Sequence, residues 1–145
     1  MTKVFIVYYS CTGNTERMAQ GIAEGVQRAG GEAMLKRAEE VSIEELAQGD
    51  VFAFGSPTYF SYMAGMLQYV LEEMYRAREK FSGKPFAAFA SGAGGEVRAL
   101  ESIERVCRAI QLNKCAEGVT STRSPNEATL EECRRLGEKL VAASG

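Results

Sequence analysis

The 145-residue sequence contains no histidine, no tryptophan and a single aspartate, Asp50. Without histidine, the Ser-His-Asp and Cys-His groupings of nucleophilic enzymes cannot form, and a common zinc ligand is missing. A receiver-type signalling domain needs several aspartates around a metal, which one aspartate cannot supply. These absences narrow considerably the chemistry that the chain can carry out.

Charge and cysteine are also sparse, with a formal net charge of −2 and four cysteines at positions 11, 107, 115 and 133. No basic stripe is present, so we expect no nucleic-acid partner. No pair of cysteines has C-x-x-C spacing, so neither a metal site nor a disulfide framework is predicted. No signal peptide and no membrane-length apolar run is evident, which predicts a cytoplasmic protein without membrane insertion.

Apolar runs alternate with segments of helical periodicity along the chain. The runs predict strands at residues 3–9, 32–36, 51–55, 86–90 and 115–121. The periodic segments predict helices at residues 14–29, 42–49, 63–78 and 96–112, and one opened by a capping box at Ser124 with Pro125 in its first turn. In the 63–78 helix, Met66 is expected on the inner face.

This alternation predicts an α/β fold: a single doubly wound domain over residues 1–145 with a five-stranded parallel sheet. The first, third and fourth strands are apolar throughout and therefore central, so the strand order 2-1-3-4-5 is expected. The carboxyl ends of the strands then bring together the loops at residues 10–15, 56–62 and 91–95.

Each of these loops has a composition suited to a different part of one ligand. The first, S-C-T-G-N-T, joins a strand to a helix N-terminus, where free amides and hydroxyls favour an anion. It holds no lysine, which disfavours a triphosphate with magnesium. The second, S-P-T-Y-F-S-Y, offers aromatic rings to a flat ligand. The third, S-G-A-G-G, leaves backbone amides free to donate to a heterocycle.

The motif S-x-T-G-N-T, followed by G-S-P-T-Y-F and a Gly-rich loop, resembles the flavodoxin-like FMN-binding family over essentially the whole chain. The resemblance implies FMN as cofactor, with its phosphate held by Ser10, Cys11, Thr12, Gly13, Asn14 and Thr15. It places the isoalloxazine against Ser56, Pro57, Thr58, Tyr59, Phe60 and Tyr62, and its pyrimidine end against Ser91, Gly92, Ala93, Gly94 and Gly95.

The resemblance implies a low-potential electron-transfer protein without catalytic residues, working with redox protein partners or a small quinone, as a monomer or homodimer. A second subclass, the NAD(P)H-dependent quinone reductases, is similar in the stretch P-T-x-F…M-x-G-x-M/L. Whether the chain is a stand-alone oxidoreductase therefore stays open, with an electron carrier favoured.

Two further interpretations are weaker. Cys11 and Arg17 have the C-x5-R spacing of the low-molecular-weight tyrosine phosphatases. However, Met18 stands where that family has Ser or Thr, and no aspartate is available in a late loop as general acid. A partner-binding domain that uses the aromatic residues of the second loop as an interface is the other alternative.

Overall fold

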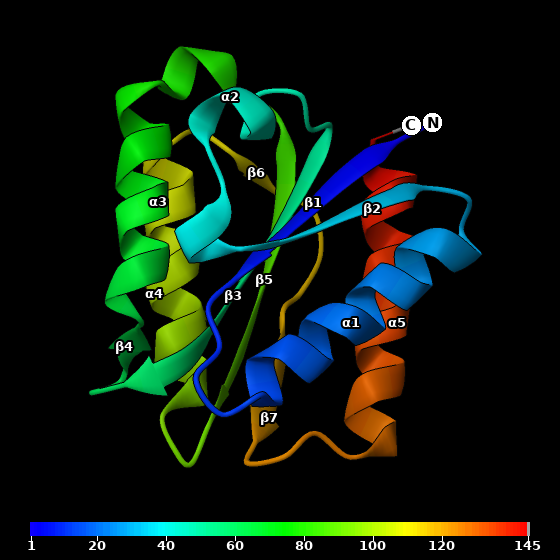
Figure 1. The fold of residues 1–145 in the computed structure, drawn as a ribbon, viewed down its shortest axis with the longest axis vertical. Helices are drawn as coiled ribbons and strands as arrows, with labels where there is room; N and C mark the ends of the chain where they lie inside the picture. Colours follow the sequence, from blue (N-terminus) through cyan, green and yellow to red (C-terminus); the bar gives the residue numbers. More distant parts are fainter. Residues whose placement is uncertain (145) are drawn as a thin grey trace.

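The computed structural model describes residues 1–144, which form a twisted sheet with helices on both faces (Figure 1). The parallel strands run in the order β2-β1-β3-β5-β6, and β7 also pairs with β5. Their bounds are β1 (Lys3–Tyr8), β2 (Glu32–Arg37), β3 (Val51–Tyr59), β5 (Pro85–Gly92), β6 (Asn113–Lys114) and β7 (Val119–Thr122). The predicted doubly wound α/β architecture and strand order are thus confirmed.

Helices α1 (Asn14–Arg28) and α5 (Glu127–Ala143) cover one face of the sheet, and α3 (Gly65–Arg76) and α4 (Glu96–Ala109) cover the other (Figure 1). Alternate side chains of one strand enter different cores, as the pleat requires. Phe52 and Phe54 of β3 pack on the α3/α4 side, whereas Val51 and Ala53 pack on the α1/α5 side. The short α2 (Ile43–Leu46) begins after Ser42, whose capping box is present as predicted.

Four details depart from the sequence-based predictions. Tyr62–Met63 form the short strand β4, antiparallel to β3, so α3 begins at Gly65 and not at residue 63. Met66, expected on the inner face of this helix, is 42% exposed. The weak last strand is divided into β6 and β7. Helix α5 is capped by Asn126, whose Oδ1 accepts from the Thr129 amide at 2.9 Å, and not by Ser124.

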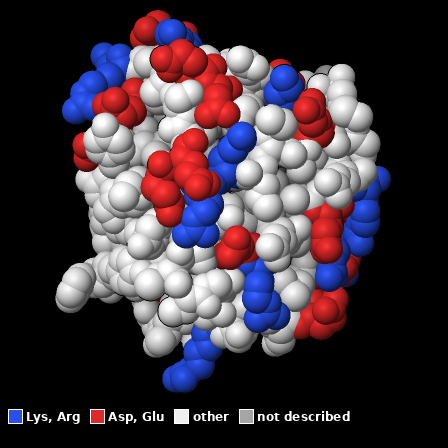
Figure 2. Space-filling model, in the orientation of Figure 1, with Lys and Arg blue, Asp and Glu red and all other residues white. Residues whose placement is uncertain are grey.

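The surface charges are mixed, and on the face shown in Figure 2 basic and acidic side chains alternate without a large patch of one sign. The lower left of this face, around the end of β3, is largely free of charged side chains. Within residues 1–144, no helix has the length and apolar character needed to cross a bilayer.

Helices α1 and α5 cross with their backbones in direct contact. A Cβ on Gly25 would overlap the Arg134 carbonyl oxygen, and one on Gly137 would overlap the Ile22 carbonyl oxygen. Backbone atoms cannot rotate away as a flexible side chain can, so only glycine fits at these two positions. This backbone contact fixes the position of α1, and thus of its N-terminus, on the face of the sheet.

We therefore expect Gly25→Ala to destabilise the protein by about 1–3 kcal/mol through overpacking, even though alanine is the better helix former. Urea unfolding followed by circular dichroism measures this. Gly65→Ala is the matched control, because a Cβ there meets nothing within 4 Å. Equal unfolding midpoints for the two variants would contradict the proposed backbone contact.

Candidate functional site

Three strand-to-helix connections meet at the end of the sheet opposite the chain termini (Figure 1). They enclose a cleft of about 410 Å³, within the usual range for small-molecule sites. Its lining combines the predicted loops with one residue from the β7–α5 connection: Cys11, Thr12, Asn14, Pro57, Thr58, Tyr59, Ser91, Gly92, Ala93 and Arg123. The structure thus brings the three predicted loops into one concave site.

The first loop ends in the N-terminus of α1. Gly13 is the N-cap residue with φ 101°, a left-handed conformation that favours glycine. The Ser10 hydroxyl accepts from the amides of Gly13 and Glu16 at 3.2 and 3.3 Å. Within residues 1–144, the amides of Asn14 and Thr15 have no recorded acceptor. Because the helix dipole adds partial positive charge there, this end of the cleft suits an anion.

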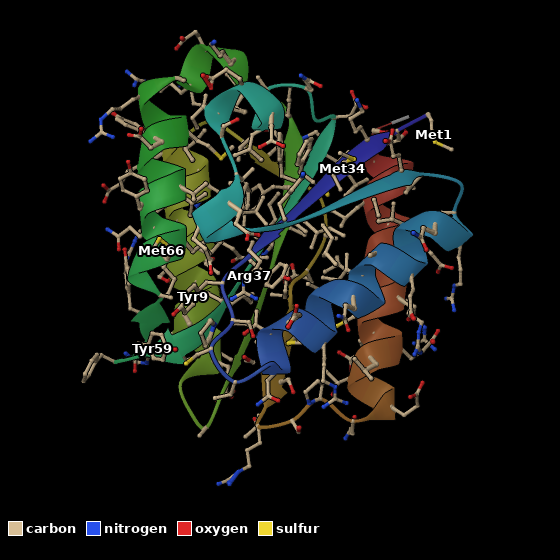
Figure 3. The ribbon with its side chains drawn as sticks, in the orientation of Figure 1. Met1, Tyr9, Met34, Arg37, Tyr59 and Met66 are labelled. Atoms are coloured by element: carbon tan, nitrogen blue, oxygen red, sulfur yellow. The ribbon has the colours of Figure 1, made fainter. Side chains whose placement is uncertain are left out.

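Arg37 of β2 lies beside the end of β1 and supports the first loop (Figure 3). Its Nη2 donates to the Ser10 carbonyl oxygen at 2.8 Å, and its guanidinium lies 5.4 Å from the centre of the Tyr8 ring. The Tyr8 hydroxyl donates to Glu16 Oε2 at 3.1 Å. Burial and this carboxylate raise the pKa of Tyr8, so the phenol stays protonated at neutral pH. These contacts hold the loop without placing a formal charge in the cleft.

The second loop is a tight hairpin that continues β3. Tyr59 pairs with Tyr62, and the turn residues Phe60 and Ser61 both have positive φ, at 53° and 62°. This combination is typical of a type I′ turn, although glycine or asparagine is more usual there. Phe60 at the tip is fully exposed, while Tyr59 is 40% exposed and lines the cleft. Burial raises the pKa of Tyr59, and the neighbouring Cys11 thiol contributes to the shift.

Ser91, at the end of β5, joins the three loops. Its hydroxyl forms a buried hydrogen bond of 2.8 Å with the Thr15 hydroxyl, and its carbonyl oxygen accepts from Thr58 Oγ1 at 2.9 Å. The next residue, Gly92, lies so close to the second loop that a Cβ would come within 2.9 Å of the Thr58 Cβ. The relative positions of the loops are therefore set by direct contact.

Glu96, the first residue of α4, holds the third loop. One carboxylate oxygen accepts from the Gly94 amide, and the other accepts from Thr122 Oγ1 at 3.0 Å. Gly94 and Gly95 both have positive φ, which lets the loop turn back into the helix. Glu96 is 8% exposed and faces the loop backbone, which makes it a structural support for the cleft wall.

The predicted site residues fall into two groups. Those that line the cleft are named above; the others support it or lie at its edge. Ser56 is fully buried, and its hydroxyl accepts from the Ala64 amide at 2.7 Å, so it shapes the second loop from behind. Ser10 and Thr15 are also buried supports. Gly13, Phe60, Tyr62, Gly94 and Gly95 belong to the same loops but do not line the cleft.

Sequence reasoning missed one residue of the lining, Arg123. It follows the last strand, in the segment S-T-R-S-P, and a parallel strand must end at the same edge as its neighbours. That rule could have added this segment to the three loops.

Arg17 contacts the segment that precedes the N-terminus of α5, where its guanidinium donates to Ser124 Oγ and the Pro125 carbonyl oxygen at 3.1 and 3.2 Å. It does not complete a phosphatase loop with Cys11.

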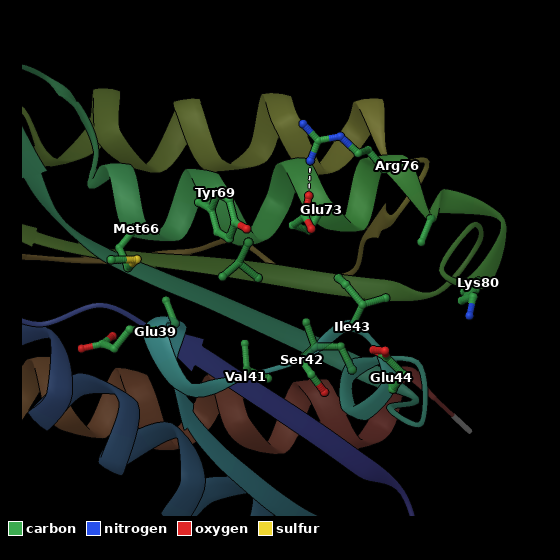
Figure 4. A pocket seen from close by; sticks show the side chains of 14 residues that line it. Glu39, Val41, Ser42, Ile43, Glu44, Met66, Tyr69, Glu73, Arg76 and Lys80 are labelled. Atoms are coloured by element: carbon green, nitrogen blue, oxygen red, sulfur yellow. Dashed lines mark hydrogen bonds and ion pairs between the residues drawn. The ribbon is translucent and has the colours of Figure 1, made fainter.

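A larger hollow, of about 640 Å³, lies apart from this cleft, between α3 and the segment that precedes and includes α2 (Figure 4). Val41, Ile43 and Tyr69 give it apolar walls, and Glu39 and Glu44 stand at its rim. The helix N-terminus on its wall belongs to the four-residue α2 and is capped by Ser42. The charges of its lining are mixed, with Glu39, Glu44 and Glu73 beside Arg76 and Lys80, so they favour no ligand of one sign. The smaller cleft is therefore the better candidate for the site.

The chain is similar to known proteins in both sequence and fold. The family model described as Flavodoxin matches residues 6–137. An NAD(P)H dehydrogenase (quinone) from Rhodopseudomonas palustris is 33% identical over 128 residues, covering 71% of this chain and 64% of the relative. A flavodoxin from Aquifex aeolicus is 29% identical, covering 97% and 86%. The solved structure of an archaeal flavodoxin superposes with a TM-score of 0.89 at 25% identity, covering 99% of both chains. The chain thus spans less than two thirds of the quinone dehydrogenase.

The four free cysteines differ sharply in environment, which predicts their order of reaction. Burial raises the pKa of Cys107 well above its usual value and that of Cys133 to about 12, and it also raises the pKa of Cys115. These thiols therefore stay protonated at pH 8, whereas the thiolate is the reactive form. Cys11 is exposed in the cleft.

With the thiol reagent DTNB at pH 8, we expect one fast-reacting thiol, Cys11, and reaction of Cys107 and Cys133 only after unfolding in denaturant. The Cys11→Ser variant is the control and should lose the fast phase. Because Cys115 is only partly buried, the decisive result is at the other two cysteines: fast labelling of Cys107 or Cys133 in the folded variant would contradict their burial.

Proposed function

Because this chain belongs to the flavodoxin family, whose members are FMN-binding electron-transfer flavoproteins, we propose that it binds FMN in the cleft at the carboxyl edge of its sheet and carries electrons at low potential. The observation that supports the location most directly is the meeting of a helix N-terminus with free amides and an aromatic hairpin in one cleft of suitable size.

The residues of the cleft fit the parts of FMN. The amides of Asn14 and Thr15 suit the phosphate, because they are unpaired and lie at the positive end of α1. Tyr59 suits the flat isoalloxazine, since it presents an aromatic ring beside the cleft. At Gly92 the backbone approaches Thr58 of the second loop too closely for any side chain, so the third loop presents no side chain to the ligand at this position.

Bound FMN supplies the redox chemistry, and the protein supplies binding, orientation and electrostatics. The Ser91 hydrogen bonds keep the loops at a fixed separation, so little reorganisation is needed when an electron arrives. Glu96 holds the third loop in place through the Gly94 amide and Thr122. The hairpin of Tyr59–Tyr62 shields one side of the cleft from water. None of these groups has to transfer a proton or form a covalent bond.

A second candidate function is NAD(P)H-dependent reduction of quinones, favoured by the name of the relative from Rhodopseudomonas palustris. The full-length alignment with the Aquifex flavodoxin favours the electron carrier instead. We infer redox proteins as partners, and the four free thiols support a reducing compartment such as the cytoplasm.

The binding proposal predicts that the apoprotein quenches FMN fluorescence on titration and binds FMN at least about tenfold more tightly than riboflavin, because charge-assisted hydrogen bonds to the phosphate are lost in riboflavin. Bound FMN should also slow the reaction of Cys11 with DTNB, since that thiol lines the cleft. Absence of FMN binding by the folded protein would overturn the proposed function.

The two candidate functions predict different reduction behaviour. For an electron carrier, anaerobic photoreduction of the FMN-loaded protein should show a one-electron stage in the visible spectrum, and NADH or NADPH should reduce it slowly. A quinone reductase should be reduced rapidly by NADH or NADPH and should transfer two electrons to a soluble quinone. Rapid turnover with NAD(P)H would therefore replace the first assignment with the second.

A further inference from the structure

Arg123 is the one charged residue among those that line the cleft within residues 1–144. It is exposed, and no acidic or carbonyl partner of its guanidinium is recorded in that part of the chain. Two carboxylates on the elements that support the cleft are engaged elsewhere: Glu96 with Gly94 and Thr122, and Glu16 with Tyr8. A free cation therefore stands at a cleft whose first loop has no lysine or arginine.

The backbone of Arg123 is held in an uncommon conformation. Its φ is 66°, in the left-handed region that costs a non-glycine residue about 1 kcal/mol. Its amide donates to the Gly92 carbonyl oxygen, and its carbonyl oxygen accepts from Ser121 Oγ at 3.1 Å. Strained residues held by their surroundings concentrate at functional sites. The hydrogen bond to Gly92 holds the backbone of Arg123 against the third loop of the cleft.

The following residues attach the same segment to the anion-binding end. Ser124 Oγ donates to Asn14 Oδ1 at 3.3 Å and accepts from Arg17 Nη1 at 3.1 Å. Arg17 also donates to the Pro125 carbonyl oxygen. The β7–α5 connection is thus fixed on one side to the N-terminus of α1 and on the other to Gly92, with Arg123 between them.

From this placement we propose that Arg123 is a cofactor-binding residue that pairs with the phosphate ester and gives the cleft its preference for phosphorylated flavin. The inference rests on the proposed function. The amides of α1 supply only partial charges, whereas the guanidinium supplies a full positive charge and planar donors that suit phosphate oxygens. The loop amides orient the phosphate, and Arg123 neutralises it from the β7–α5 connection.

The test compares Arg123→Gln with Arg98→Gln in titrations of the apoproteins with FMN and with riboflavin. Both variants remove one positive charge, and Arg98 is exposed near the start of α4 but does not line the cleft. We expect Arg123→Gln to weaken FMN binding about tenfold, the effect of losing one charge-assisted hydrogen bond, and to leave riboflavin binding unchanged. Arg98→Gln should bind both ligands as the wild type does.

Two further measurements separate a local contact from a general charge effect. Arg123→Lys, which keeps the charge but not the planar donors, should have intermediate FMN affinity. The affinity of the wild type for FMN should fall more steeply with added salt than that of Arg123→Gln, because salt screens an exposed ion pair. Urea unfolding midpoints close to wild type would show that the variants are folded.

The possible outcomes are distinct. If the wild type binds FMN and Arg123→Gln binds it equally well, the inference is wrong while the proposed function stands. If Arg123→Gln loses the same factor of affinity for FMN and for riboflavin, the guanidinium contacts the flavin ring. The inference that Arg123 pairs with the phosphate is then wrong. If the wild type binds neither ligand, the proposed function fails and this inference fails with it.

Discussion

The cleft depends on the hydrogen bonds of one residue, Ser91. Its hydroxyl contacts Thr15 at the start of α1, and its carbonyl oxygen accepts from Thr58 in the hairpin, so a single position at the end of β5 sets the spacing of three loops. The contact with Thr15 is buried and that with Thr58 is partly buried, and away from solvent a hydrogen bond is stronger and an unpaired group is costly. A ligand that spans these loops therefore meets a pre-formed surface.

Rigid packing behind the cleft makes this arrangement possible. The backbone contact at Gly25 and Gly137 fixes α1 against α5, and Arg37 ties the first loop to β2. Against this frame the protein tolerates left-handed conformations at Phe60, Ser61 and Arg123. These three positions lie in the connections at the carboxyl edge of the sheet, whereas a fourth, Gln111, lies after the end of α4. The stable cores on the two faces of the sheet thus support strained backbone at the edge where the ligand is proposed to bind.

The cleft presents mainly dipoles to the proposed ligand, with little formal charge. The first loop offers amides and hydroxyls, the third offers backbone groups, and the carboxylates of Glu16 and Glu96 are engaged in structural contacts. Such a cleft can hold a flavin and its phosphate while leaving the charge that develops on reduction only weakly compensated, which suits a low redox potential. Arg123 is the one charged residue of the cleft lining within residues 1–144, which is why we propose it as the group that selects the phosphorylated flavin.

Local patterns in the sequence determined the alternation of strands and helices, the strand order and the three loops, because burial on two faces and helix capping are properties of neighbouring residues. The tertiary structure alone decided which residues of those loops face the cleft. Ser56 is buried and its hydroxyl accepts from the Ala64 amide, and Met66 is exposed because the inner face of α3 is formed by Leu67, Val70, Leu71 and Met74. Arg123 reaches the site through contacts with Gly92 and, by way of Ser124, with Asn14. These contacts join residues far apart in the sequence, and they form only when the sheet brings the ends of its strands to one edge.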